Sequence, residues 1–158
     1  MNALAICQVS TQEMRPGTLI TVTGTLDETA NMERYATSKP PIVVDLGGVQ
    51  FVSSLGVREW VRFLRGASKT APVRLRRCPE PMVLQFNMVT ATVEGAEVES
   101  FQAPYLCDKC GREESIVLDV RKDFPAGRRS TPPDRVCAEC GARSTFAEMP
   151  ERYLLFLA

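Results

Sequence analysis

The chain of 158 residues contains no histidine. Histidine is the most common general base of enzymes and the most common zinc ligand of proteins. Its absence excludes schemes in which histidine activates a serine or a cysteine, and it excludes catalytic zinc sites that need imidazole. The sequence also offers no pair of catalytic carboxylates. These absences together predict a protein that is not an enzyme.

Net charge and long apolar runs are missing as well. The 19 basic residues balance 19 acidic residues, whereas a protein that binds nucleic-acid phosphates usually has a basic excess. The balance argues against nucleic acid as the main partner. No segment approaches the roughly 18 apolar residues that span a bilayer, and residues 1–15 lack the features of a secretory signal. We therefore expect a cytoplasmic protein with no membrane partner.

Cysteine, in contrast, is present in a pattern that predicts a metal site. Two C-x-x-C-G units occur, with the cysteines at Cys107, Cys110, Cys137 and Cys140. Two thiolates three positions apart bind one metal only if the chain turns tightly, and glycine accepts the positive φ of such turns. Four soft sulfur ligands predict a closed tetrahedral site for structural Zn²⁺. The alternative is two separate redox pairs, but these usually open a helix in a thioredoxin-like context.

The remaining pattern predicts an α/β fold with a mixed sheet, because strand-like and helix-like segments alternate. We expect strands over 4–9, 19–25, 42–46, 49–52, 73–77 and 97–105, and helices over 31–38, 53–66 and 82–88. Gly47 and Gly48 are expected to turn the chain. Two domains are expected: residues 1–103, and a small β zinc ribbon over 104–158 with a strand at 114–120 and a C-terminal helix at 149–157. The apolar side chains of this helix are expected to pack on the ribbon or on the sheet, and the alternative is a contact with a partner or a second copy.

The helix that follows Ser53 and Ser54 is the clearest helical signal. Serine is a favoured N-cap. Apolar residues at helical spacing form one stripe, which we expect to face the sheet, and arginines at helical spacing form a separate basic face. The stripe consists of Val57, Trp60, Val61 and Leu64, and the basic face of Arg58, Arg62 and Arg65. A rigid helix start with an exposed basic face is a candidate surface for binding a partner.

Three segments also carry a family resemblance. They are ITVTGTLDE at 20–28, IVVDLGGV at 42–49, and the turn SSLG at 53–56. Together, over roughly residues 1–100, they resemble a STAS domain, the fold of bacterial anti-sigma factor antagonists. The resemblance implies a regulatory protein-interaction module whose protein partner is a serine kinase of the anti-sigma type. Ser54 matches the serine that this kinase phosphorylates in regulatory members, and Ser53 replaces the usual aspartate.

Two alternatives stay open for these residues. The two serines could have no role beyond capping the helix, in which case neither Ser53 nor Ser54 is phosphorylated. For the protein as a whole, the alternative is a nucleic-acid-associated regulator that binds through the zinc ribbon and through Arg128 and Arg129 in its loop. Cys7 and Cys78 stand alone in the sequence, and we interpret them as small core residues.

Overall fold

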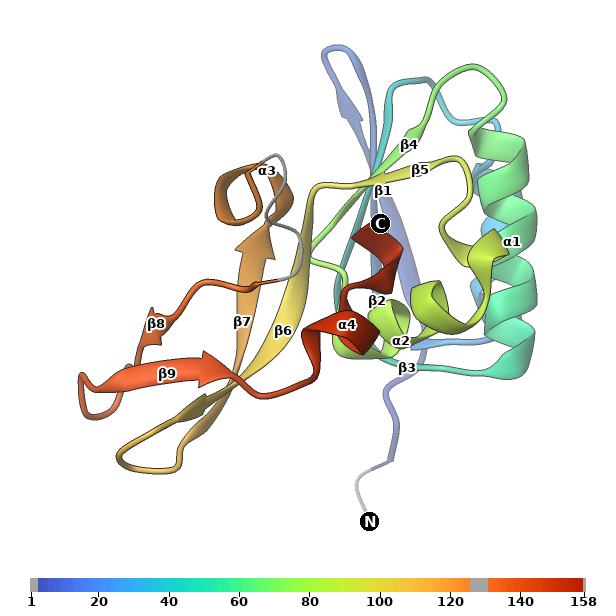
Figure 1. Ribbon diagram of the computed structural model, residues 1–158. Coiled ribbons are helices and arrows are strands. Elements are labelled where there is room, and N and C mark those ends of the chain that lie inside the picture. Colours follow the sequence, from blue (N-terminus) through green and yellow to red (C-terminus); the bar gives the residue numbers. More distant parts are fainter. Residues whose placement is uncertain (1–2, 126–130, 158) are drawn as a thin grey trace.

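The computed structural model describes residues 3–125 and 131–157, and it is a mixed α/β protein with two sheets (Figure 1). Sheet A has five strands in the order β1-β2-β3-β4-β5, and sheet B has four in the order β7-β6-β9-β8. β1 pairs with β2 antiparallel, whereas β2, β3, β4 and β5 run parallel. The predicted fold class is confirmed. In the described part of the chain, no helix is long and apolar enough to cross a membrane.

The strands of sheet A follow the apolar segments of the sequence. They are β1 (Gln8–Met14), β2 (Gly17–Leu26), β3 (Ile42–Val52), β4 (Val73–Arg76) and β5 (Ala96–Val98). β3 lies at the centre of the sheet, and the run from Ile42 to Leu46 is buried on both faces. That placement explains why this run shows no alternation of apolar and polar residues.

Two details of sheet A differ from the prediction. Gly47 and Gly48 do not turn the chain, because β3 continues through them with a register shift opposite β2. Glycine is required there for space: a Cβ on Gly48 would lie 2.6 Å from the Thr23 Cγ2 atom. The first strand begins at Gln8 rather than at residue 4, although the Ala5 carbonyl still accepts the Thr25 N–H at 2.9 Å.

Helix α1 (Ser54–Ala67) packs on one face of sheet A, next to the short 3-10 helices η1 (Glu28–Ala30) and η2 (Met32–Tyr35). These two 3-10 helices replace the single helix expected over 31–38. Trp60 and Leu64 of the predicted stripe are buried, and Phe63 completes the buried face in place of Val61. The helix was expected to end at residue 66 but continues to Ala67, so Gly66 lies inside it, where a Cβ would meet Ala36 at 2.8 Å.

Sheet B consists of β6 (Ser100–Cys107), β7 (Glu113–Asp119), β8 (Arg135–Val136) and β9 (Arg143–Phe146). The remaining helices are α2 (Glu80–Met88), which contacts β3 and β6, η3 (Thr90–Thr92), which contacts α1 and α2, and α3 (Val120–Asp123), α4 (Pro150–Tyr153) and η4 (Leu155–Leu157). The tail packs on α2 and on β6 of sheet B, as predicted, but it forms the short helices α4 and η4 in place of one helix over 149–157. Tyr153 donates its hydroxyl to the Gln102 carbonyl at 2.6 Å, and the Phe156 ring meets the Phe101 ring edge-on with centroids 5.0 Å apart.

One hydrophobic core joins the two sheets. Phe101 and Leu118 of sheet B belong to the same buried cluster as Trp60 and Val44 of the sheet A region. The predicted boundary between residues 103 and 104 falls inside β6. The division into two domains, residues 1–103 and 104–158, stays a prediction.

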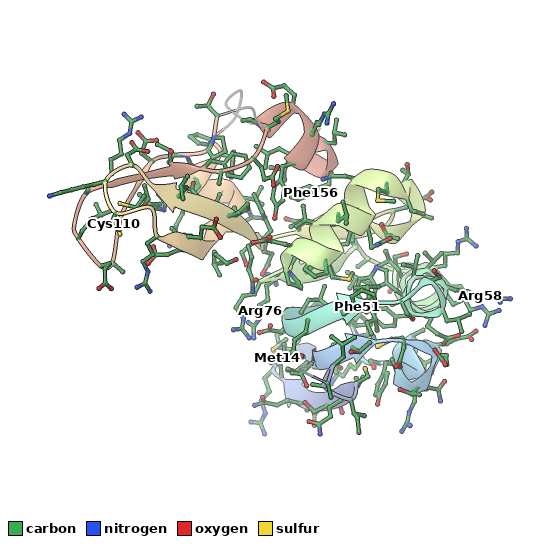
Figure 2. The ribbon with its side chains drawn as sticks, turned by 90° about the horizontal axis from the view of Figure 1, so that it is seen from below. Met14, Phe51, Arg58, Arg76, Cys110 and Phe156 are labelled. Carbon is green, nitrogen blue, oxygen red and sulfur yellow. The ribbon has the colours of Figure 1, made fainter. Side chains whose placement is uncertain are left out.

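The cysteine cluster and α1 lie on opposite sides of the molecule, as the labelled side chains of Cys110 and Arg58 show (Figure 2).

Candidate functional site

The four predicted ligands come together at the far end of sheet B in two turns of the same geometry. Cys107 is the last residue of β6, and its carbonyl accepts the Gly111 N–H at 3.1 Å. Cys137 follows β8, and its carbonyl accepts the Gly141 N–H at 3.0 Å. Gly111 has φ +72° and Gly141 has φ +71°, a left-handed conformation that glycine adopts without strain. The glycine after each cysteine pair therefore makes the turn, as the sequence predicted.

The distances between the sulfur atoms fit one tetrahedral metal ion. The Sγ atoms of Cys107 and Cys140 are 3.4 Å apart, those of Cys110 and Cys137 are 3.7 Å apart, and all four lie within 4.8 Å of one another. A tetrahedral zinc ion with Zn–S bonds of about 2.3 Å places its sulfur ligands about 3.8 Å apart. The four cysteines therefore form a possible metal site, and in the described ranges no other group of His, Cys, Asp or Glu residues does so.

Backbone groups of the first turn favour a thiolate at Cys107. The N–H groups of Cys110 and Lys109 each lie 3.4 Å from the Cys107 Sγ atom. The Cys110 N–H has the largest effect, and together these groups outweigh the opposing effect of burial and lower the pKa of the Cys107 thiol to about 6. Since the thiolate is the form that binds metal, these N–H groups favour the metal-binding form of Cys107.

Charged side chains link the two turns outside the sulfur cluster. The Arg112 guanidinium reaches Glu114 at 2.8 Å and Glu139, between the cysteines of the second turn, at 2.9 Å. Arg143 lies 3.2 Å from Asp108, between the cysteines of the first turn. The pairs Arg112–Glu139 and Arg143–Asp108 are open to solvent, so each contributes little to the free energy of folding, whereas the Glu114 side chain is only 16% exposed. These ion pairs connect the two turns but leave the site open to solvent, since Cys110 and Cys140 are exposed.

At the other predicted site, the start of α1, Ser53 and Ser54 have different roles. The Ser53 Oγ atom accepts the Gly56 N–H at 3.0 Å, so Ser53 is the N-cap. Ser54 is the first helical residue, and its side chain is exposed. The helix start is pressed against the end of β2, because a Cβ on Gly56 would lie 1.9 Å from the Leu26 carbonyl oxygen. The turn that carries Ser54 is therefore held in one position.

The predicted basic face of α1 is exposed. Arg58 and Arg65 point to solvent, and Arg62 forms an ion pair with Glu59 at 3.4 Å on the same helix. Arg128 and Arg129, proposed from the sequence as a nucleic-acid contact, lie outside the described residues.

An apolar surface next to Ser53 was not foreseen from the sequence. The side chains of Phe51 and Leu55 flank the serine turn and are 46% and 48% exposed, and Leu84 on α2 is 56% exposed. A groove of about 550 Å³ runs from Phe51 along α2 to Tyr153, and Glu80 and Glu148 are among its lining residues. No local sequence signal marks this groove, because α2, β3 and the tail form it together.

Two further titratable residues, Asp45 and Cys78, take structural roles. Asp45 is buried, and it forms ion pairs with Arg77 at 2.8 Å and Arg76 at 3.3 Å. Burial opposes ionisation of Asp45, but the hydrogen bonds from Arg77 and from the Gly47 N–H outweigh it and lower the pKa of the carboxyl. Cys78 is fully buried, and burial raises the pKa of its thiol, as expected for a core cysteine.

Comparison of the chain with family models, with curated proteins and with solved structures finds no match in any of the three.

Proposed function

We propose that the protein is a non-enzymatic bacterial regulatory module of the anti-sigma factor antagonist type, which binds a protein partner at the start of α1 and is stabilised by one structural Zn²⁺. The observation that carries the zinc part is the cluster of four cysteine sulfur atoms within 4.8 Å. The observation that carries the docking part is an exposed Ser54 on a fixed helix start, beside exposed apolar side chains.

The composition of the metal site supports a structural role for zinc. All four ligands are thiolates, so the tetrahedron is closed and no coordination position is left for a substrate. Bound there, zinc would cross-link the end of β6 to the β8–β9 turn, far along the chain. The free energy of zinc binding would stabilise folded sheet B, because an unfolded chain does not hold the four sulfur atoms together.

The start of α1 supports docking for a separate reason. β3 ends at Val52 and α1 begins at Ser54, so the strand, turn and helix follow one another as in the STAS signature. The cap bond of Ser53 and the close contact of Gly56 fix the turn before any partner arrives. A fixed surface loses little conformational entropy on binding. Phe51 and Leu55 would supply apolar contacts on either side of Ser54.

Phosphorylation of Ser54 by an anti-sigma-type serine kinase is the regulatory step that this proposal includes. A phosphate adds a charge of about −1.5 to −2. The helix N-terminus tolerates a negative charge, so the fold would persist. A partner that covers Phe51 and Leu55 would have to desolvate that charge, which opposes docking.

Metal analysis tests the zinc part of the proposal. Protein purified under reducing conditions without chelator should contain about one zinc per chain. Protein that contains no metal under these conditions, and that keeps its thermal stability in excess chelator, would contradict the assignment.

The substitution Ser54→Glu tests the docking part. We expect the thermal midpoint to stay within a few degrees, because a charge at a helix N-terminus contributes only about 0.3–1 kcal/mol. Affinity for a partner recovered by pull-down and mass spectrometry should fall at least about tenfold, which is about 1.4 kcal/mol. Thr70→Glu is the matched control, since Thr70 is exposed just beyond the other end of α1. Equal affinity of the Ser54→Glu variant and the control would exclude this surface.

A further inference from the structure

β1 is an edge strand, and no strand among residues 3–125 and 131–157 pairs with its outer side. It pairs with β2 on one side, and it stands at the end of the strand order of sheet A. All its side chains are exposed or partly exposed. The pairing with β2 is continuous from Gln8 to Met14 without a bulge. A long, regular edge of this kind offers its backbone groups to another strand.

The register shows which backbone groups point outward. The Thr18 N–H of β2 donates to the Pro41 carbonyl at 3.0 Å, on the β3 side. Because successive N–H groups of a strand alternate in direction, Leu19 and Thr21 point toward β1. Their partners on β1, Gln12 and Ser10, are therefore the residues that bond to β2. The backbone groups of the residues between and beside them point away from the sheet: Val9, Thr11 and Glu13.

The other edges of the described sheets are protected in ways that β1 is not. β5 has three residues and β8 has two, so both are too short to template a strand. β7 is as long as β1, but Glu113 and Asp119 at its ends would face each other in a symmetric antiparallel pair and repel. β1 contains no proline and no lysine, and Glu13 is its one charged residue.

We propose that two copies of this chain associate through β1, as antiparallel strands related by a two-fold axis at Thr11. In this register Thr11 faces its own copy, and Val9 faces Glu13. All three are outward-pointing positions, so each facing pair exchanges two N–H···O bonds. Glu13 meets an apolar residue rather than a like charge. The pairing joins the two five-stranded sheets into one continuous sheet.

Self-pairing fits β1 better than capture of an unrelated peptide. In a two-fold pair of strands, the outward-pointing residues must lie symmetrically on either side of the residue at the axis, and no two like charges may face each other. With Thr11 at the axis, β1 meets both requirements. The β1 edge is separate from the four cysteines and from Ser54, so association through it does not depend on zinc or on docking at α1. A failure of the proposed function would leave this inference untouched, and the reverse also holds.

Hydrogen exchange of the unmodified, zinc-loaded protein is the first test. In the monomer, the amides of Ser10 and Gln12 are protected by β2, whereas those of Val9, Thr11 and Glu13 exchange freely. In the dimer all five are protected. We expect protection of the three outward amides to rise with protein concentration, together with the mass measured by sedimentation. A protein that stays monomeric at millimolar concentration, with these amides unprotected, would overturn the proposal.

The pair Thr11→Pro and Thr11→Ala is the second test. Proline removes the outward N–H, which is tolerated on an edge strand because that N–H does not serve β2. Alanine removes the same side chain but keeps the N–H. We expect the dimer dissociation constant to rise about 10–100-fold for Thr11→Pro, since two bonds are lost per dimer, and to change much less for Thr11→Ala. Equal dissociation constants for the two variants would place the interface elsewhere.

A third variant covers the case in which Thr11→Pro does not fold. Thr11→Lys leaves the backbone intact but puts two like charges directly opposite each other at the two-fold axis. It should be monomeric at low salt and regain association as salt screens the repulsion. Association of Thr11→Lys that equals that of the unmodified protein at low salt would refute the register.

Discussion

Gly111→Ala is a sharp test of the cysteine turns, because the structure separates its backbone effect from any steric effect. Gly111 has φ +72°, and a Cβ added there would meet nothing within 4 Å. The alanine methyl group is therefore not excluded by space. The cost comes from the left-handed conformation alone.

The size of the effect follows from that conformation. A residue with a Cβ in the left-handed region loses about 1–2 kcal/mol relative to glycine. If the metal-bound turn needs this φ, the dissociation constant for zinc should rise about 5–30-fold, since each 1.4 kcal/mol of binding free energy changes that constant tenfold. The thermal midpoint of the zinc-loaded protein should fall by about 2–8 °C, as expected for a chain of this size. Gly141→Ala should behave alike, because Gly141 has φ +71° and the same open surroundings.

Competition with a chromophoric zinc chelator measures the affinity, and calorimetry measures the midpoint. Lys109→Ala is the control, because Lys109 lies between the same two cysteines with an exposed side chain and acts on Cys107 only through its backbone N–H. If Gly111→Ala binds zinc as tightly as Lys109→Ala, the turn does not need a left-handed residue, and our account of the site is wrong.

Three further predictions concern other parts of the molecule. Cys137→Ser should abolish stoichiometric zinc binding and unfold at least sheet B, as seen by circular dichroism, because three thiolates and a hydroxyl do not replace the closed site. Asp45→Asn should lower the free energy of unfolding by about 1–3 kcal/mol at neutral pH. Since the pKa of Asp45 is lowered in the fold, its stabilising effect is full above its ordinary pKa and is lost as pH falls through the lowered one. The difference from Asp45→Asn in denaturant titrations should therefore shrink below about pH 4. Finally, gel shifts at low salt should show no strong binding to DNA, and a shift that disappears in an Arg128→Ala/Arg129→Ala variant would instead favour the nucleic-acid alternative.

The features that sequence reasoning predicted correctly are those determined by nearby residues. The cysteine turns depend on five consecutive residues each, so spacing alone located them. The cap at Ser53 and the buried Trp60 likewise follow from the local pattern of α1. The strand expected over 73–77 is present as β4 (Val73–Arg76), with Val73 and Leu75 buried.

The errors arise where a distant segment decides the outcome. Gly47 and Gly48 have the composition of a turn, but pairing with β2 and the need for space beside Thr23 keep them in a strand. Val61 was placed on the buried stripe by helical spacing, but the surroundings of α1 bury Phe63 more completely. The exposure of Phe51 depends on where α2 and the tail pack, which no local pattern encodes.

β6 has a practical consequence for locating a partner on this molecule. Its first residue, Ser100, accepts the Arg77 N–H at 2.9 Å through its hydroxyl, beside sheet A, and its last residue, Cys107, is a metal ligand. No loop interrupts this path, and its eight residues extend over at most about 27 Å. An ion held by the four cysteines is therefore fixed in position relative to sheet A. Co²⁺ in place of zinc would serve as a built-in paramagnetic reference, from which the distance to any bound partner can be measured without attaching a label.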